Sequence, residues 1–195
     1  LQKITIRRMK ISFNIDYETV FGEEILLNVV ERVKNVKDKL SQFRMNNVHG
    51  KHWWYDLNKT ASAQNTVIDY FYSVDCDGSE KRHEWFTQPH RLELNANNGK
   101  SYKVFDRWID IPEDSYLYSS AFTECVNKRK LSAPISSNYS KTIRLIVRAP
   151  QLRDNKSLAI VGKADCIGAW DVFKAVPMCE HNYNEWVVDI DASRL

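Results

Sequence analysis

Residues 157–171 read SLAIVGKADCIGAWD. The apolar run from Leu158 to Val161 predicts a strand, and Gly162 ends it. A short polar turn follows, and Gly168 stands two residues before Trp170. Glycine has no side chain and adopts backbone angles that other residues avoid, so little would surround the indole. The pattern therefore predicts a loop with Trp170 at its lip, and the alternative is a tryptophan packed on the core.

Length and composition describe a chain that can bury one large core or two small ones. It has 195 residues, 43% of them hydrophobic, and 28 basic against 25 acidic residues give a net charge of +3. These charges are spread along the chain, which argues against nucleic acid or an anionic membrane as the partner. No apolar run reaches the roughly 20 residues of a membrane span.

The four cysteines, Cys76, Cys125, Cys166 and Cys179, show no CxxC spacing. The usual zinc motifs are therefore excluded. Scattered single cysteines are typical of a reducing compartment, so we expect a cytoplasmic protein, with a mature secreted chain as the alternative.

Short strand-like segments separated by turn signals predict an all-β sandwich. The segment from Glu31 to Phe43 is the exception, and we expect a loop there with at most a short helix. The predicted strands cover residues 10–15, 25–30, 53–57, 67–74, 83–86, 91–94, 102–105, 141–147, 157–162 and 184–190.

The two halves of the chain repeat each other. Trp54 and Trp186 lie 132 positions apart, and the same spacing relates the alternating residues Ile11, Phe13 and Ile15 to Ile143, Leu145 and Val147. A period this long indicates two copies of one domain. We expect an immunoglobulin-like antiparallel β-sandwich in two tandem copies, the second truncated. The expected parts are an N-terminal extension at 1–9, a first domain at 10–111, a linker at 112–140 and the N-terminal part of a second domain at 141–195.

The sequence offers no catalytic constellation. It has no GxSxG, no HExxH and no phosphate-cradling glycine loop, and its five histidines do not cluster at ligand spacing. No pair of carboxylates is nominated for acid/base work. We therefore expect no enzymatic activity within these residues, and no metal or cofactor.

Aromatic side chains gather instead near predicted turns, at Phe21, Trp85, Trp170 and Tyr183. Flat apolar rings on loops suit a sugar, because one face of a glucose ring carries mostly C–H groups while its hydroxyls reach polar neighbours. Those hydroxyls need partners, because burying them unpaired is costly.

The segment IGAWD, which follows a strand, a glycine and a short turn, resembles the signature of starch-binding domains, carbohydrate-binding module family 20. The resemblance implies that Trp170 stacks on glucose rings. In the first copy, WFTQPHR resembles the family's Trp-Glu-x-x-Pro-Asn-Arg, which implies a stacking role for Trp85 and a weaker hydrogen-bonding role for Glu84. FGEE resembles the segment whose aromatic serves a second glucan site, which implies that role for Phe21 and, in the second copy, for Tyr183. The first copy lacks the loop that carries Trp170 in the second.

Two such domains in tandem, with YLYSSAF at 116–122 closing the first, resemble one group of enzymes. These are the cytosolic 4-α-glucanotransferases of the plant disproportionating-enzyme type and their bacterial relatives, members of glycoside hydrolase family 77. The resemblance implies a catalytic (β/α)₈ barrel downstream of this sequence.

Two functions follow from this reading. The first is a non-catalytic module that holds an α-1,4-glucan (starch, glycogen or maltooligosaccharide) near a glucanotransferase domain. The second is a structural sandwich pair that positions or dimerises a neighbouring domain without binding sugar. A binder needs Trp85 and Trp170 exposed, whereas a spacer would bury both. The incomplete second domain is expected to pack against a second copy, as a homodimer, or against a continuation of the chain, because open strand edges tend to pair.

Overall fold

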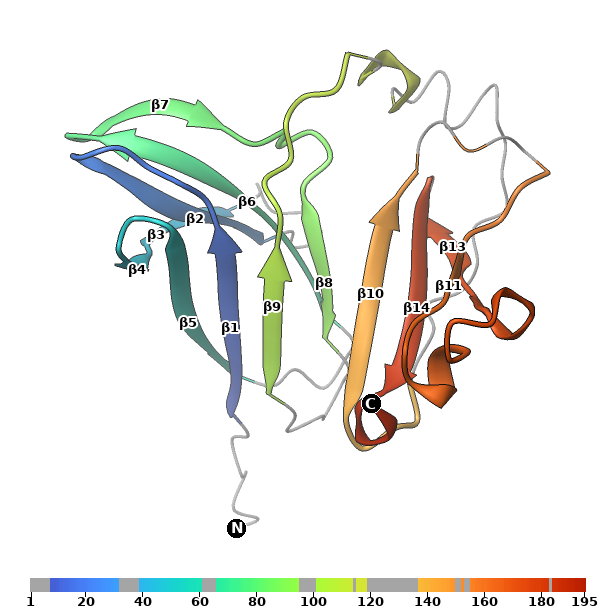
Figure 1. Cartoon of the computed structure of the whole chain (residues 1–195). Helices are drawn as coiled ribbons and strands as arrows, with labels where there is room; N and C mark the ends of the chain where they lie inside the picture. The colour runs from blue at the N-terminus through green and yellow to red at the C-terminus, as the bar shows by residue number, and fades with distance from the viewer. Residues whose placement is uncertain are drawn as a thin grey trace, which may run out of the picture. The chain divides into compact units, whose positions relative to one another are not determined.

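The chain is built of β-strands and short 3₁₀ turns, as a computed structural model shows (Figure 1). The structure describes residues 8–31, 39–60, 66–94, 101–113, 115–118, 137–149, 152, 155–182 and 184–195. Those residues contain no α-helix, and none of their helical segments is long and apolar enough to span a membrane. The predicted all-β fold is confirmed.

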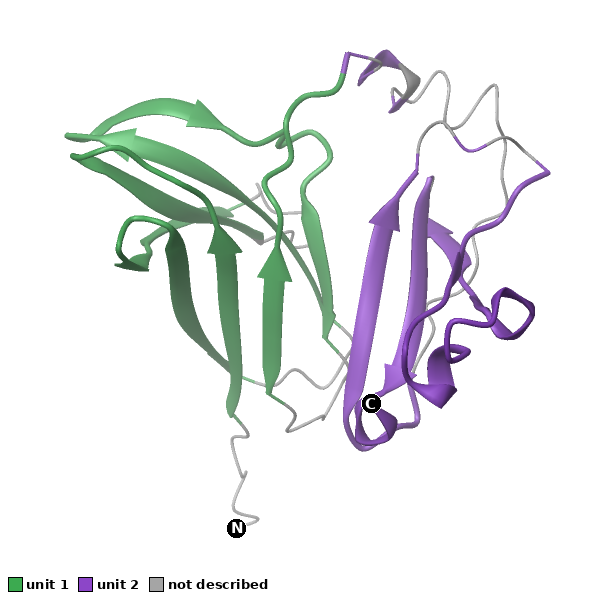
Figure 2. Ribbon diagram, in the orientation of Figure 1, with its two compact units in different colours: residues 1–112 green, residues 113–195 purple. Residues whose placement is uncertain are grey.

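The chain divides into two compact units (Figure 2). Unit 1 is Leu1–Pro112 and unit 2 is Glu113–Leu195. Most of the predicted linker, residues 119–136, lies outside the described residues. Each unit has its own cluster of buried side chains.

The first sheet of unit 1 has the order β4-β5-β1-β9. Inward-facing residues alternate along β1 and include Ile11, Phe13 and Ile15, as the sequence pattern predicts. β1 pairs antiparallel with β5 and parallel with β9, which closes this otherwise antiparallel sheet. The strands are β1 (Arg8–Asp16), β4 (Asn46–Val48), β5 (His52–Thr60) and β9 (Tyr102–Asp106).

The second sheet of unit 1 has the order β3-β2-β6-β7, and β8 also pairs with β6. The predicted loop over residues 31–43 is wrong at its C-terminal end, where residues from Lys39 pair antiparallel with β2. Alternation of Ser41 and Phe43 with more exposed neighbours fits a half-buried strand, although the same residues read as a helical period. The strands are β2 (Glu23–Glu31), β3 (Lys39–Arg44), β6 (Thr66–Cys76), β7 (Ser79–His83) and β8 (His90–Leu94).

The core of unit 1 lies between these sheets. Phe13 of β1 and Tyr70 of β6 meet edge to face with ring centroids 4.7 Å apart, and Trp53, 1% exposed, packs in the same cluster. Aromatic pairs of this geometry add to the gain from burial alone. The sandwich therefore depends on side chains contributed by both sheets.

A polar network sits at one end of this core. The Asp106 carboxylate accepts hydrogen bonds from the hydroxyls of Tyr70 (2.9 Å) and Tyr72 (2.8 Å). His90 lies between Asp106 and Glu84, with its Nε2 3.1 Å from Glu84 Oε1 and its Nδ1 3.6 Å from Asp106 Oδ1. Burial raises the pKa of Asp106, and the nearby His90 and the two tyrosine hydroxyls offset part of that rise.

Unit 2 contains a three-stranded sheet in the order β10-β14-β13 and a two-stranded sheet, β11-β12. Trp186 and Val188 from the first sheet pack with Ile160 and Val176 from the second. The strands are β10 (Thr142–Arg148), β11 (Ala159–Ile160), β12 (Val176–Pro177), β13 (Cys179–Asn182) and β14 (Glu185–Asp191). The 3₁₀ turns among the described residues are η1 (Ser115–Tyr118), η3 (Asp165–Ile167), η4 (Val172–Lys174) and η5 (Ala192–Arg194).

The strand order β13-β14-β10 repeats the order β4-β5-β1 of unit 1. Trp186 pairs with Val147 across β10 and β14, while across β1 and β5 Ile15 pairs with Trp53. The structural counterpart of Trp186 is therefore Trp53, and the predicted match to Trp54 is wrong by one residue. Because side chains alternate across a strand, that single step moves the match from the outer face to the core face.

Replacing Trp53 by alanine should destabilise unit 1 far more than replacing Trp54. Trp53 is 1% exposed and its indole N–H donates to the carbonyl of Tyr17 at 3.1 Å. A buried tryptophan cut to alanine costs about 3–5 kcal/mol. Urea unfolding of both variants checks this, and equal losses would contradict the register assigned here.

The polar network predicts a pH dependence. A raised carboxyl pKa means that the folded state holds the Asp106 proton more tightly than the unfolded chain does. This contribution to stability is complete below the unfolded pKa of 3.8 and is lost as pH rises through the folded pKa. Asp106→Asn removes it, so the melting temperature of the variant should rise relative to wild type as pH increases above 3.8. A difference in melting temperature between the variant and wild type that does not change with pH would contradict the raised pKa of Asp106.

Candidate functional site

The connection between β11 and β12 carries the most exposed tryptophan among the described residues. Trp170 is 69% exposed, whereas the strands that flank its loop pack into the core of unit 2. The predicted loop with Trp170 at its lip is confirmed.

The backbone of this loop is held in an unusual conformation. Gly168, Ala169 and Trp170 have φ values of 86°, 49° and 64°, three consecutive residues in the left-handed region. Only glycine adopts this conformation without cost, and each other residue there costs on the order of 1–3 kcal/mol. Hydrogen bonds offset the strain: Trp170 N–H donates to the Gly162 carbonyl at 2.8 Å, and Gly162 N–H donates to Ile167 at 2.8 Å.

A side chain at the two glycines of the loop would meet different obstacles. At Gly162, a Cβ would meet the Cδ1 end of the Ile167 side chain, so Ile167 would have to shift to make room for it. At Gly168, a Cβ would lie 2.8 Å from the backbone oxygen of Lys174, and φ is also left-handed there. The loop therefore closes tightly on its own second half.

Asp171 organises the residues that follow the tryptophan. Its carboxylate accepts from the Phe173 N–H at 3.0 Å and lies 3.5 Å from Lys174 Nζ, at the start of η4. Val172 and Phe173 are 69% and 96% exposed. Sequence reasoning missed both, although an aspartate followed by two apolar residues in a predicted loop was the available signal. The loop thus combines exposed apolar faces with charged hydrogen-bonding groups.

In unit 1, Glu84 is buried and fully engaged, which contradicts its expected contact with a sugar. It is 1% exposed, and its carboxylate accepts from the backbone N–H groups of Tyr72 and Ile109, each at 2.8 Å. His90 lies 3.1 Å from the same carboxylate. Since buried carboxylates need such partners, Glu84 is better explained as a support that joins β6 to the segment after β9.

Trp85 is also buried, at 8% exposed, so the expectation of an open stacking ring is wrong in this structure. The backbone N–H of Trp85 donates to the Ile109 carbonyl at 3.0 Å, which fixes the backbone next to the buried Glu84. Phe86 is instead 52% exposed, with its ring 5.1 Å from His83 and 5.9 Å from Phe71. In the turn after β7, the Phe86 side chain is therefore exposed where that of Trp85 is buried.

Phe21 and Tyr183 are the two residues expected at a second glucan site. Phe21 is fully exposed in the turn between β1 and β2, where Gly22 has a φ of 87°. Glu23 accepts from the Val20 N–H and pairs with Arg82 at 2.9 Å, which fixes that turn. Tyr183 lies outside the described residues. The roles of Phe21 and Tyr183 as glucan contacts stay predictions.

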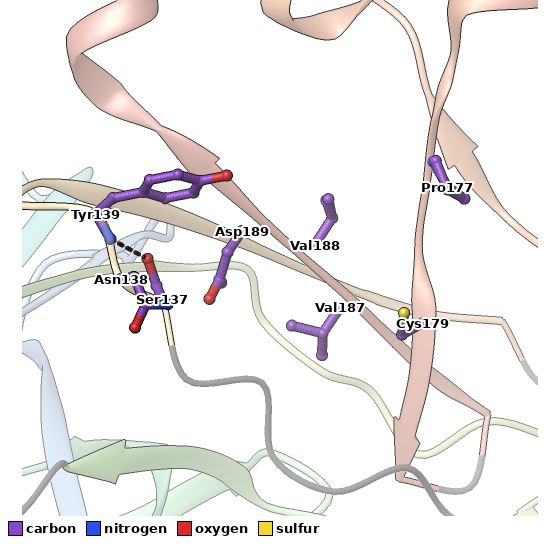
Figure 3. Close-up of a pocket in the computed structure, with 8 residues that line it drawn as sticks. All are labelled: Ser137, Asn138, Tyr139, Pro177, Cys179, Val187, Val188 and Asp189. Atoms are coloured by element: carbon purple, nitrogen blue, oxygen red, sulfur yellow. Dashed lines mark hydrogen bonds between the residues drawn. The ribbon is translucent and has the colours of Figure 1, made fainter.

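A shallow pocket of about 310 Å³ lies elsewhere in unit 2 and contains none of these residues (Figure 3). Asp189, its acidic group, is paired with Arg144 at 2.7 and 2.8 Å. The described residues contain no group of three potential metal ligands there or elsewhere. The pocket is lined by Ser137, Asn138, Tyr139, Pro177, Cys179, Val187, Val188 and Asp189.

A comparison with known protein families finds a match within unit 2. Residues 140–194 match the family described as starch binding domain. The match contains β10 to η5 and the whole Trp170 loop, and none of unit 1. In structure, the chain is similar to Glycoside Hydrolase Family 15 Glucoamylase from Hypocrea jecorina, with 18% identity and a TM-score of 0.41, over 53% of this chain and 18% of that one. No curated protein matches the chain.

Trp85→Ala should lower the stability of unit 1 strongly, because the ring is buried beside the Glu84 network. The expected loss is about 3–5 kcal/mol. Phe86→Ala is the matched control, since it removes an exposed ring one residue on and should change the melting temperature little. Thermal unfolding of both variants checks this, and an unchanged melting temperature for Trp85→Ala would contradict the burial of the Trp85 ring.

Proposed function

We propose that unit 2 binds α-1,4-glucan by stacking glucose on the exposed ring of Trp170. The observation that carries the proposal is the left-handed backbone at Gly168 to Trp170, which holds the indole 69% exposed within the segment that matches the starch binding domain. Backbone strain of this kind concentrates at ligand sites.

The chemistry of the loop fits a sugar. The indole face takes the C–H side of a glucose ring, and Asp171 and Lys174, on the same turn, can accept from and donate to its hydroxyls. The Lys174 side chain is 73% exposed and that of Asp171 is 38% exposed, so both reach solvent. The site needs no metal or cofactor, and we propose a non-catalytic binding role.

Stacking predicts weak binding at one site. About 60 Å² of covered ring face at about 25 cal/mol per Å² gives about 1.5 kcal/mol per glucose. Net hydrogen bonding adds on the order of 1 kcal/mol for each bond. One stacked glucose with roughly two to three such hydrogen bonds then brings a single site near 1 mM, which corresponds to about −4.1 kcal/mol. Tight retention on a polysaccharide would need several sites on one chain.

The proposal extends to the protein of which this module forms part. We propose a cytoplasmic 4-α-glucanotransferase, in which the module holds polysaccharide near the catalytic domain. The repeated strand order β4-β5-β1 and β13-β14-β10 supports a tandem pair of related domains, and the three described cysteines, none in a disulfide, suit a reducing compartment.

Unit 1 supports the second function, that of a structural sandwich. Glu84 and Trp85, its two main sugar candidates, are buried at 1% and 8% exposed. We propose that unit 1 is mainly a structural domain and that its glucan contact is the exposed turn at Phe21.

Trp170→Ala should abolish retention of the 195-residue chain in a native gel containing glycogen, while its melting temperature stays close to that of wild type. The reason is that the ring is exposed, so its removal deletes the stacking face without opening a cavity. Phe105→Ala, a variant in unit 1 that removes a ring 68% exposed and assigned no role in glucan binding, is the control. Equal retention of Trp170→Ala and wild type would contradict the proposed site.

A further inference from the structure

The exposed surface of the Trp170 loop does not end at the tryptophan. Val172 and Phe173 follow it, 69% and 96% exposed. Scattered apolar residues at a surface need no explanation, but contiguous ones mark a site of interaction. Three of the four residues 170 to 173 are therefore exposed apolar side chains, and we refer to Trp170, Val172 and Phe173 as the patch.

Hydrogen bonds hold the backbone of the turn that carries the patch. Asp171 accepts from the Phe173 N–H at 3.0 Å through its side chain and from the Lys174 N–H at 2.9 Å through its carbonyl. The Ala175 N–H then donates to Val172 at 3.3 Å. These bonds close η4, the turn that carries the exposed Phe173.

Size and spacing decide what the patch can bind. Three side chains offer at most a few hundred Å², well below the roughly 800 Å² that each partner contributes to a stable protein interface. The Cα atoms of Trp170 and Phe173, three residues apart, are at most about 11 Å from each other. A flexible chain of sugar rings can reach both aromatic side chains, while charged groups at Asp171 and Lys174 lie between and beside them.

We propose that Phe173 is a second glucose-stacking residue, which extends the Trp170 site along the glucan chain. This rests on the proposed function of Trp170. A disaccharide occupies the tryptophan alone, whereas a longer maltooligosaccharide also covers Phe173. Phe173 thus makes the site selective for chain length.

The test is a titration of the 195-residue chain with maltose and with maltoheptaose, followed by NMR, for wild type and matched variants. Phe173→Ala should weaken maltoheptaose binding about tenfold, which is about 1.4 kcal/mol, and leave maltose binding unchanged. Phe173→Trp should keep the preference for the longer ligand. Phe173→Leu, which keeps apolar area but loses the flat ring, should behave like the alanine variant. Val172→Ala is the control for loss of exposed apolar area from the same turn.

The outcomes separate this inference from the function beneath it. If wild type binds maltoheptaose and Trp170→Ala does not, but Phe173→Ala matches wild type for both ligands, the role of Phe173 is overturned and that of Trp170 stands. An equal loss in Val172→Ala overturns it too, since area rather than the ring would then matter. If wild type binds neither ligand, both proposals fail. Melting temperatures of the Phe173 variants should equal that of wild type, because the ring is almost fully exposed.

Discussion

The hydrogen bond from the Trp170 N–H to the Gly162 carbonyl, 2.8 Å long, is the contact on which the exposed site depends. It joins the backbone just after β11 to the far side of the loop, and it accompanies three successive residues in the left-handed conformation. The loop therefore combines a strained backbone with a solvent-exposed apolar ring, and both features are unfavourable for folding stability.

Unit 1 shows the opposite arrangement with the same kind of residues. The Glu84 carboxylate draws two backbone N–H groups and His90 around it, and a buried charge needs all of these partners. Once Glu84 is enclosed, the adjacent Trp85 is fixed through its own N–H to Ile109 and lies inside as well. A demand for hydrogen-bond partners at one position thus settles the exposure of its neighbour.

Sequence reasoning was effective where one physical pattern controls the outcome. Alternation along residues 10–15 located β1 and its core face, and the two glycines around residues 162–168 located the exposed tryptophan. It failed where tertiary partners decide. The segment at 39–44 has a helical period but pairs with β2, and the exposure of Trp85 depends on distant residues such as Ile109. The choice between Trp53 and Trp54 needed the strand register, since adjacent tryptophans are equivalent in the sequence and face opposite sides of the sheet.

The strand frame and the site are therefore separable. β4-β5-β1 and β13-β14-β10 share order and register, with Trp53 and Trp186 at matching core positions. In that shared frame Trp53 and Trp186 face the core and Trp54, on the outer face of β5, is half-buried, so the most exposed tryptophan, Trp170, comes from outside the frame. What differs between the units is the connection that leaves the second strand of each: β2 runs for nine residues into its sheet, whereas β11 stops after two and gives way to the Gly162 loop. A short strand leaves residues free to form a strained, self-closed loop. The exposed ring of Trp170 thus lies where the strand frame ends early, in a connecting loop and not on a strand.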